Sequence, residues 1–425
     1  MTAQPVAGTE AVTGRAPASS IKDLKWTAHM MAISLGLSVP MILFGKAVGG
    51  ALFVVMSVLV LVAPGREAAF RALASLHKRP LVWVLLALFA VWAVSVAGSI
   101  DPMKSAQVWL RMIAFLTLAA AIWARMMCEP ALLDRTLTVL VLASVATGVA
   151  ALIGIFLLPE QIAALGLKLP KYYASAVACL VPLVVWAGFR AGGRMRLLAI
   201  AYPALAVGAI AGMSSRSAVA GLAFSALAMG LAWGARNVSR RTALLLMVAA
   251  IAAACIVLAF IFVNLPPLPY QPDSEPFIPS ALIDKHRQVI WSFTLNLVGQ
   301  APLFGHGLDV INEVTGAGQR IVGIGSEYIP SHPHNWILEV LVETGVVGLS
   351  LMAIALTFAA YGVLSNLRAG MPGALAALGV FAAFWSASLF NFSIWSAWWQ
   401  VSFLVLYAIG LAGKQQRSGP GLVGG

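Results

Sequence analysis

The chain has 425 residues, of which 61% are hydrophobic and only 10% are charged, and its mean hydropathy is +0.92. Soluble proteins carry roughly a quarter charged residues, so this composition excludes an ordinary soluble enzyme, and the hydrophobicity excludes a disordered chain. The net charge of +12 comes from basic residues that punctuate apolar runs without forming a basic stripe, so no nucleic-acid partner is expected. The three cysteines form no CxxC pair and no disulfide framework.

The remaining class is an all-α polytopic membrane protein, because the apolar runs are long and do not alternate as barrel strands do. A spanning helix needs roughly 20 apolar residues. Windows of that length predict about twelve transmembrane helices, at 27–45, 47–63, 81–99, 106–124, 137–158, 172–189, 197–213, 217–235, 242–264, 345–365, 373–391 and 394–412. Gly45, Lys46, Gly49 and Gly50 indicate a hairpin or a broken helix between the first two.

The predicted helices divide the chain into five parts. These are a disordered cytoplasmic tail at 1–26, nine transmembrane helices in 27–264, a loop domain at 265–335, three more transmembrane helices in 336–412 and a cytoplasmic tail at 413–425. With the N-terminus in the cytoplasm, 18 of the 27 Lys and Arg residues fall on the cytoplasmic side. This bias predicts that both termini are cytoplasmic and that the loop domain lies on the outer side.

The loop domain is much longer than the other connections, and loops of that length are usually functional. Six prolines between Pro266 and Pro279 favour an extended chain at its start. Residues 281–297 then place apolar side chains on one helical face, which predicts an amphipathic helix along the membrane surface. The segment also holds four of the six histidines: His286, His306, His332 and His334. We therefore expect the chemistry of the protein to lie in this region.

Two arginines are candidates for anion binding. Arg216 lies in GMSSRSAVAG between two apolar spans, where an arginine is costly and marks a functional site by default, although it could also snorkel to the interface. Arg287 lies on the predicted amphipathic helix, where it could equally bind lipid headgroups. A guanidinium group suits phosphate because it donates two parallel hydrogen bonds and stays charged.

The sequence SHPHNWILEVLVETGVVGL contains two further candidates. Asn335 is a suitable N-cap for a helix that begins at Trp336, which would place His334 at the helix start near the outer membrane boundary. Three roles stay open for His332 and His334: a general base, a structural pair, or two zinc ligands completed by His306 or a carboxylate. Glu339 and Glu343 follow on one face of the same helix, and the glycines beside His306 allow a tight turn or a close approach to a ligand.

Together, SSRS around Arg216, the loop Arg287, the GHG turn and HNWILEVLVETGVVGL resemble the O-antigen ligase and polymerase superfamily of bacterial envelope enzymes, over about residues 80–410. The resemblance implies a GT-C type fold in the bacterial inner membrane, with a periplasmic active site and neither metal nor cofactor. In that family two arginines engage the diphosphate of a polyprenyl-linked glycan and a histidine serves the acceptor. These roles match Arg216, Arg287 and His334, with His332 as a second candidate base and His332 and Asn335 as candidate substrate contacts.

The implied function is transfer of O-antigen glycan from undecaprenyl diphosphate to lipid A–core oligosaccharide, inverting and independent of metal and ATP. An O-antigen polymerase or a protein O-oligosaccharyltransferase would use the same donor. The short segment after the last predicted span favours the ligase, because protein-glycosylating relatives often carry an added periplasmic domain. A transporter is less expected, because ionisable groups near the middle of the predicted spans are almost absent.

Overall fold

The computed structural model describes residues 18–164, 171–272, 278–280 and 282–413, and in these ranges every regular element is a helix. The first half comprises α1 (Ala18–Ser38), η1 (Pro40–Phe44), α2 (Lys46–Val62), α3 (Arg66–Ala74), η2 (Ser75–Lys78), α4 (Pro80–Ala97), α5 (Pro102–Cys128), α6 (Pro130–Phe156) and α7 (Pro159–Ala164). The second half comprises α8 (Lys171–Ala191), α9 (Gly193–Gly212), α10 (Arg216–Ala235), α11 (Arg240–Val263), α12 (Lys285–Val298), η3 (Ile311–Glu313), α13 (Trp336–Arg368), α14 (Ala374–Ser388) and α15 (Ala397–Ala412).

Eight helices in the described ranges are long and apolar enough to cross a membrane: α4, α5, α6, α8, α9, α10, α11 and α13. A ninth span would be formed by α2 with the segment 66–78, which is bent by 91° against it. The protein is therefore a multi-pass membrane protein, but the predicted number of twelve is not confirmed. The predicted spans at 373–391 and 394–412 are helices of 15 and 16 residues. At 1.5 Å per residue they are shorter than a hydrocarbon core of about 30 Å.

The N-terminal part of the chain also differs from the prediction. Helix α1 begins at Ala18, inside the stretch 1–26 that was expected to be a disordered tail, whereas most of the C-terminal tail lies outside the described residues. The break predicted near Gly45 is present: η1 ends at Phe44, Gly45 adopts a φ of +137°, and α2 begins at Lys46.

The core is centred on α8, which packs against α6, α9, α10 and α14. The most apolar stretch of α8 is 72% buried, whereas the corresponding stretch of α11 is 0% buried, so α11 is peripheral. Hydrogen bonds show which loops share an end of the bundle. At one end, which we call the long-loop end, Ile100 donates to the His306 carbonyl (3.1 Å) and Asn391 donates to Ser217 (3.0 Å).

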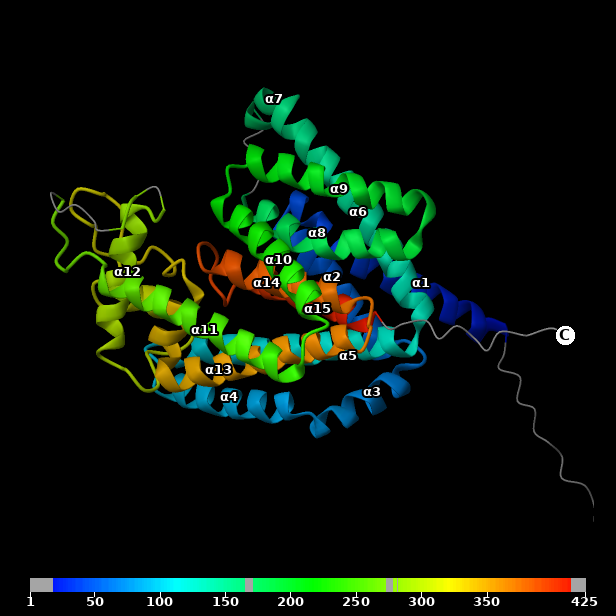
Figure 1. The fold of residues 1–425 in the computed structure, drawn as a ribbon, viewed down its shortest axis with the longest axis horizontal. Helices are drawn as coiled ribbons and strands as arrows, with labels where there is room; N and C mark the ends of the chain where they lie inside the picture. Colours follow the sequence, from blue (N-terminus) through cyan, green and yellow to red (C-terminus); the bar gives the residue numbers. More distant parts are fainter. Residues whose placement is uncertain (1–17, 165–170, 273–277, 281, 414–425) are drawn as a thin grey trace, which may run out of the picture.

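The opposite end is marked by a different set of contacts. Arg190 pairs with Asp134 (2.9 Å), and Arg368 donates to the carbonyl of Val238 (3.3 Å). In Figure 1, α12 and its flanking loops lie at one side of the molecule, and α3 lies at the other. The contacts at the long-loop end thus gather the loop domain, the Arg216 turn and the loop between α14 and α15.

Candidate active site

The long helix α13 is interrupted at Gly345, which adopts a φ of +68°. The turn Gly305–Gly307 lies against this break: His306 and Gly307 donate through their backbone N–H groups to the carbonyls of Val342 (3.1 Å) and Glu343 (3.0 Å). A Cβ on Gly345 would lie 2.1 Å from the Leu303 carbonyl. The turn therefore satisfies the backbone groups that the break exposes, and these two N–H groups are not free to cradle a phosphate.

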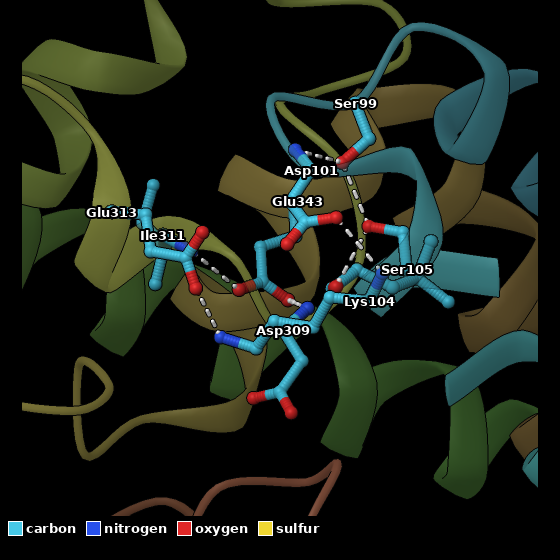
Figure 2. Close-up of polar contacts among 9 residues, drawn as sticks. Ser99, Asp101, Lys104, Ser105, Asp309, Ile311, Glu313 and Glu343 are labelled. Carbon is cyan, nitrogen blue, oxygen red and sulfur yellow. Dashed lines mark hydrogen bonds and ion pairs between the residues drawn. The ribbon is translucent and has the colours of Figure 1, made fainter. Parts of the chain in front are cut away.

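The short helical stretch before the break carries Glu343, which is fully buried and bonded to three donors. Its carboxylate accepts from the backbone N–H groups of Asp309 (2.8 Å) and Ile311 (3.2 Å) and from the indole N–H of Trp395. Figure 2 shows Glu343 at the centre of a polar cluster in which the Asp309 carboxylate points away from it. Nearby, Lys104 on α5 pairs with Glu313 (2.6 Å). Glu343 thus joins the loop domain to the bundle.

Residues 389–396, which we call the α14–α15 loop, are held from two sides. Glu339, one turn before Glu343, accepts from the backbone N–H of Ile394 (2.9 Å). Arg111 on α5 donates to the carbonyl of Trp395 (2.6 Å). Buried polar groups require such partners, because an unsatisfied buried polar group is costly. The loop is therefore fixed by side chains from α5 and α13.

The α14–α15 loop presents the carbonyl of Asn391 to both candidate histidines. His334 Nδ1 lies 2.8 Å and His332 Nε2 lies 2.7 Å from this oxygen. A carbonyl only accepts, so both ring nitrogens must carry the proton. His332 Nδ1 is also occupied, because it lies 2.8 Å from the hydroxyl of Ser331. His334 Nε2 has no hydrogen bond to another described residue, so its lone pair is available to accept a proton.

The surroundings keep both imidazoles neutral. Burial, then the neighbouring His334, lowers the pKa of His332 to about 4. Burial is also the main cause that lowers the pKa of His334, and the positive charge of Arg287 lowers it further. A neutral imidazole is the form that can take up a proton. His334 adopts a φ of +56°, a conformation that costs about 1–3 kcal/mol and persists only where neighbours impose it.

The structure brings Arg287 close to the histidines, and it places Ser217, the neighbour of Arg216, on the hydrogen-bond network of Asn391. Arg287 lies in the first turn of α12, near the two rings, with an ion pair to Asp284 (3.4 Å) and a side chain that is 27% exposed. Arg216 begins α10, is exposed, and makes no ion pair with any described residue. Its neighbour Ser217 accepts from the side chain of Asn391.

Asn335 caps the start of helix α13. Its side chain is 1% exposed, and its oxygen accepts from the backbone N–H groups of Ile337 (3.0 Å) and Leu338 (3.4 Å). The predicted N-cap is thus confirmed, and we assign Asn335 to positioning His334 rather than to touching substrate. The predicted amphipathic helix begins at Lys285, four residues later than expected, and packs through Ile290 and Trp291 on the start of α13.

In the described part of the chain, no three His, Cys, Asp or Glu side chains lie where they could together hold a metal ion, so no ligand set for zinc is found there. His306 instead directs its ring to the Leu297 carbonyl (3.0 Å). Sequence reasoning missed Asn391 and Arg111. Asn391 acts through its backbone carbonyl, which any residue provides, so its type carries no signal. The type of residue at Arg111 did carry a signal, because an arginine inside an apolar span is a candidate functional residue.

The chain shows similarity to known proteins over part of its length. The family model described as O-antigen ligase matches residues 201–353, which include Arg216, Arg287, His332, His334 and Asn335. The resemblance stated from the motifs is thereby confirmed for this region.

Two curated relatives are similar over a comparable length. A Rickettsia conorii protein named "Putative polysaccharide ligase RC0486" is 27% identical over 129 residues, which are 30% of this chain and 31% of the relative. A Rickettsia prowazekii protein named "Putative polysaccharide ligase RP358" is 26% identical over 132 residues, 30% of this chain and 32% of the relative. The matches span about a third of these relatives and support a ligase-type role.

Proposed function

Because residues 201–353 match the O-antigen ligase family, we propose that this protein transfers O-antigen glycan from undecaprenyl diphosphate to lipid A–core oligosaccharide. The observation that carries the proposal is the state of His334. Its Nδ1 is committed to the Asn391 carbonyl, its Nε2 is left as an acceptor, and the positive charge of Arg287 acts on the ring. A neutral imidazole next to a guanidinium group suits a reaction that removes one proton while negative charge grows on a phosphate.

The proposed reaction is a direct displacement. A hydroxyl oxygen of the acceptor sugar attacks the anomeric carbon of the donor glycan, and the bond from that carbon to the diphosphate oxygen breaks. Undecaprenyl diphosphate leaves with the electron pair, and the hydroxyl proton moves to His334 Nε2. Attack opposite the leaving group inverts the anomeric centre.

The two arginines would stabilise the leaving diphosphate. Arg216 is exposed and unpaired within the described residues, and the ion pair of Arg287 is long, so both guanidinium groups can turn to an incoming phosphate. Their fixed charge needs no proton exchange, which suits a leaving group that gains negative charge. His332 would orient His334 through the shared Asn391 carbonyl, since both of its own ring nitrogens are occupied.

The protein would act at the periplasmic face of the inner membrane. We place the protein in the bacterial inner membrane with the long-loop end in the periplasm and both termini in the cytoplasm. The bias of Lys and Arg residues toward the opposite end supports this orientation. Undecaprenyl-linked glycan in the outer leaflet carries its own leaving group, so the reaction requires no ATP on that side.

The test is a transfer assay with the purified full-length protein in lipid nanodiscs. A synthetic undecaprenyl-diphosphate glycan is the donor, and lipid A–core, a second prenyl-linked repeat unit or an acceptor protein is offered in separate arms. We expect transfer to lipid A–core and release of undecaprenyl diphosphate. His334→Gln should lower turnover by about 10²–10⁴-fold, the usual contribution of a general base.

The matched control is His77→Gln, because His77 is an exposed histidine at the opposite end. It should leave transfer unchanged. Transfer only to the repeat unit or to the protein would replace the ligase with one of the alternatives. Full activity in His334→Gln would refute the assignment of the base.

A further inference from the structure

Two apolar pockets contact the α14–α15 loop, one at Phe390 and the other at Ser396. The smaller one, of about 360 Å³, is lined by residues near the start of α12, including Ile283, and by Phe390. The larger one, of about 550 Å³, lies between α2, α5 and α15 and is lined by Phe53, Phe115 and Trp398. The smaller pocket lies beside the helix that carries Arg287, and the larger one contacts the last residue of the loop, Ser396. The loop whose Asn391 carbonyl orients the candidate base therefore contacts two pockets fit for hydrocarbon.

The break between η1 and α2 lines the larger pocket, through Ile42 and Lys46. Non-helical chain at membrane depth is tolerated where it lines a cavity. Gly49 lets α2 approach the end of α1 and η1, since a Cβ there would lie 2.7 Å from the Ser38 carbonyl oxygen and 2.8 Å from Ile42 Cγ1. Gly50 also lines the pocket, and a Cβ on it would meet no atom within 4 Å. The space at Gly50 is thus open and could take a hydrocarbon chain.

Lys46 supplies one positive charge at this pocket. Its ammonium lies 4.8 Å from the centroid of the Tyr172 ring and 5.1 Å from that of Trp398. The side chain is exposed and makes no ion pair with a described residue. An apolar pocket with a lysine on its lining fits an amphiphile that has hydrocarbon chains and an anionic head.

The rings that hold Lys46 connect the pocket to the candidate active site. Trp398 packs on Phe392 with ring centroids 4.8 Å apart, and Phe392 is the residue after Asn391. Tyr172 lies one turn before Ser175, whose hydroxyl is 3.5 Å from that of Ser217. The pocket therefore opens at the long-loop end, next to the residues that orient His334.

We propose that the pocket between α2 and α15 receives the lipid part of the acceptor, a phosphate-bearing acylated lipid, with Lys46 bound to its phosphate. This inference rests on the proposed function, in which both substrates are anchored in the membrane. In a direct displacement the attacking and leaving groups occupy opposite sides of the reacting carbon. Two lipid-anchored substrates therefore need separate binding sites, and the donor would occupy the smaller pocket, beside the helix that carries Arg287.

Filling the pocket gives the sharpest test. Gly50→Leu places a side chain in the open space, and leucine also favours helix over glycine, so the variant should fold. The matched control is Gly230→Leu on α10, where a Cβ likewise meets no atom within 4 Å and which does not line the pocket. In the nanodisc transfer assay, Gly50→Leu should raise KM for lipid A–core by about tenfold or more, within the range of one hydrophobic pocket contact.

KM for the undecaprenyl-diphosphate donor should stay unchanged in the same variant. Lys46→Gln should raise the acceptor KM in the same direction, with Lys78→Gln at the opposite end as its control. A deacylated core oligosaccharide used as acceptor should lose this sensitivity, since it has no chains to place in the pocket.

The outcomes separate the two proposals. No transfer by the wild-type protein to any acceptor defeats the proposed function. Normal transfer by the wild type, with an unchanged acceptor KM in Gly50→Leu, overturns the pocket assignment alone. A raised donor KM in Gly50→Leu also overturns it, because the pocket would then hold the prenyl chain of the donor.

Discussion

The two ends of the helix bundle use the same side-chain types in opposite ways. At the opposite end, the side chain of Arg125 is 1% exposed, pairs with Glu129 (2.6 Å) and donates to the carbonyl of Pro64. At the long-loop end, Arg216 is exposed and has no acidic partner among the described residues. A guanidinium group engaged by the protein stabilises the fold, whereas one left open can bind an anion from outside.

The histidines at the two ends of the bundle also differ in how they are bonded. His77 lies on a surface turn, where its ring bonds to the Ala74 carbonyl (2.5 Å). His334 is held in a left-handed conformation, its Nε2 bonds to no other described residue, and the positive charge of Arg287 acts on its ring. The described non-glycine residues with a positive φ are Ser214, Asp309 and His334, so backbone strain gathers at the long-loop end, as expected near a functional site.

The largest expected difference between the ends is the response to loss of an arginine. Arg216→Ala should lower kcat for glycan transfer by about 10²–10³-fold, the usual effect of removing one donor to a developing charge, and should leave the melting temperature unchanged. Arg125→Ala should do the reverse, lowering the melting temperature while the folded fraction keeps its kcat, because it leaves the Pro64 carbonyl and Glu129 without their buried partner.

Turnover and thermal unfolding measured on the same preparations check this pair. A fall in melting temperature with Arg216→Ala, or a loss of kcat with Arg125→Ala, would erase the distinction between the ends.

The sequence predicted the helical membrane class and most spans, because long apolar runs are a strong local signal. It also predicted the N-cap Asn335, since capping depends on neighbours in the chain. It did not predict that the GHG turn closes the break at Gly345, because that contact joins residues about forty positions apart. The convergence of His332 and His334 on one backbone carbonyl was equally hidden, as no side-chain pattern records it.

A smaller effect is expected from residues that act through the α14–α15 loop. Arg111→Met removes the bond to the Trp395 carbonyl, and the loop that positions Asn391 should loosen. We expect kcat to fall by about 10–100-fold with little change in either KM, as for a small displacement of a catalytic group. Arg111→Lys should restore part of the rate, because it retains a donor at that position.

The matched variant at the opposite end is Arg190→Met, which breaks the ion pair with Asp134. It should leave kcat unaltered, because that pair does not contact the loop. Equal losses in Arg111→Met and Arg190→Met would mean that any lost arginine weakens the enzyme through general destabilisation.

The smallest expected effect is a shift in the pH profile. Burial and Arg287 lower the pKa of His334 from its ordinary value of 6.5, so the neutral base persists below pH 6.5 and kcat/KM should fall only at more acidic pH. The pKa of His332, about 4, places its protonation further into acid. Arg287→Gln removes a positive charge and should raise the midpoint of the acid limb, whereas Arg190→Gln at the opposite end should leave it in place. Single-turnover rates measured from pH 4.5 to 8 test this prediction. If the midpoint moves equally in both variants, or in neither, the charge of Arg287 does not set the acid limb.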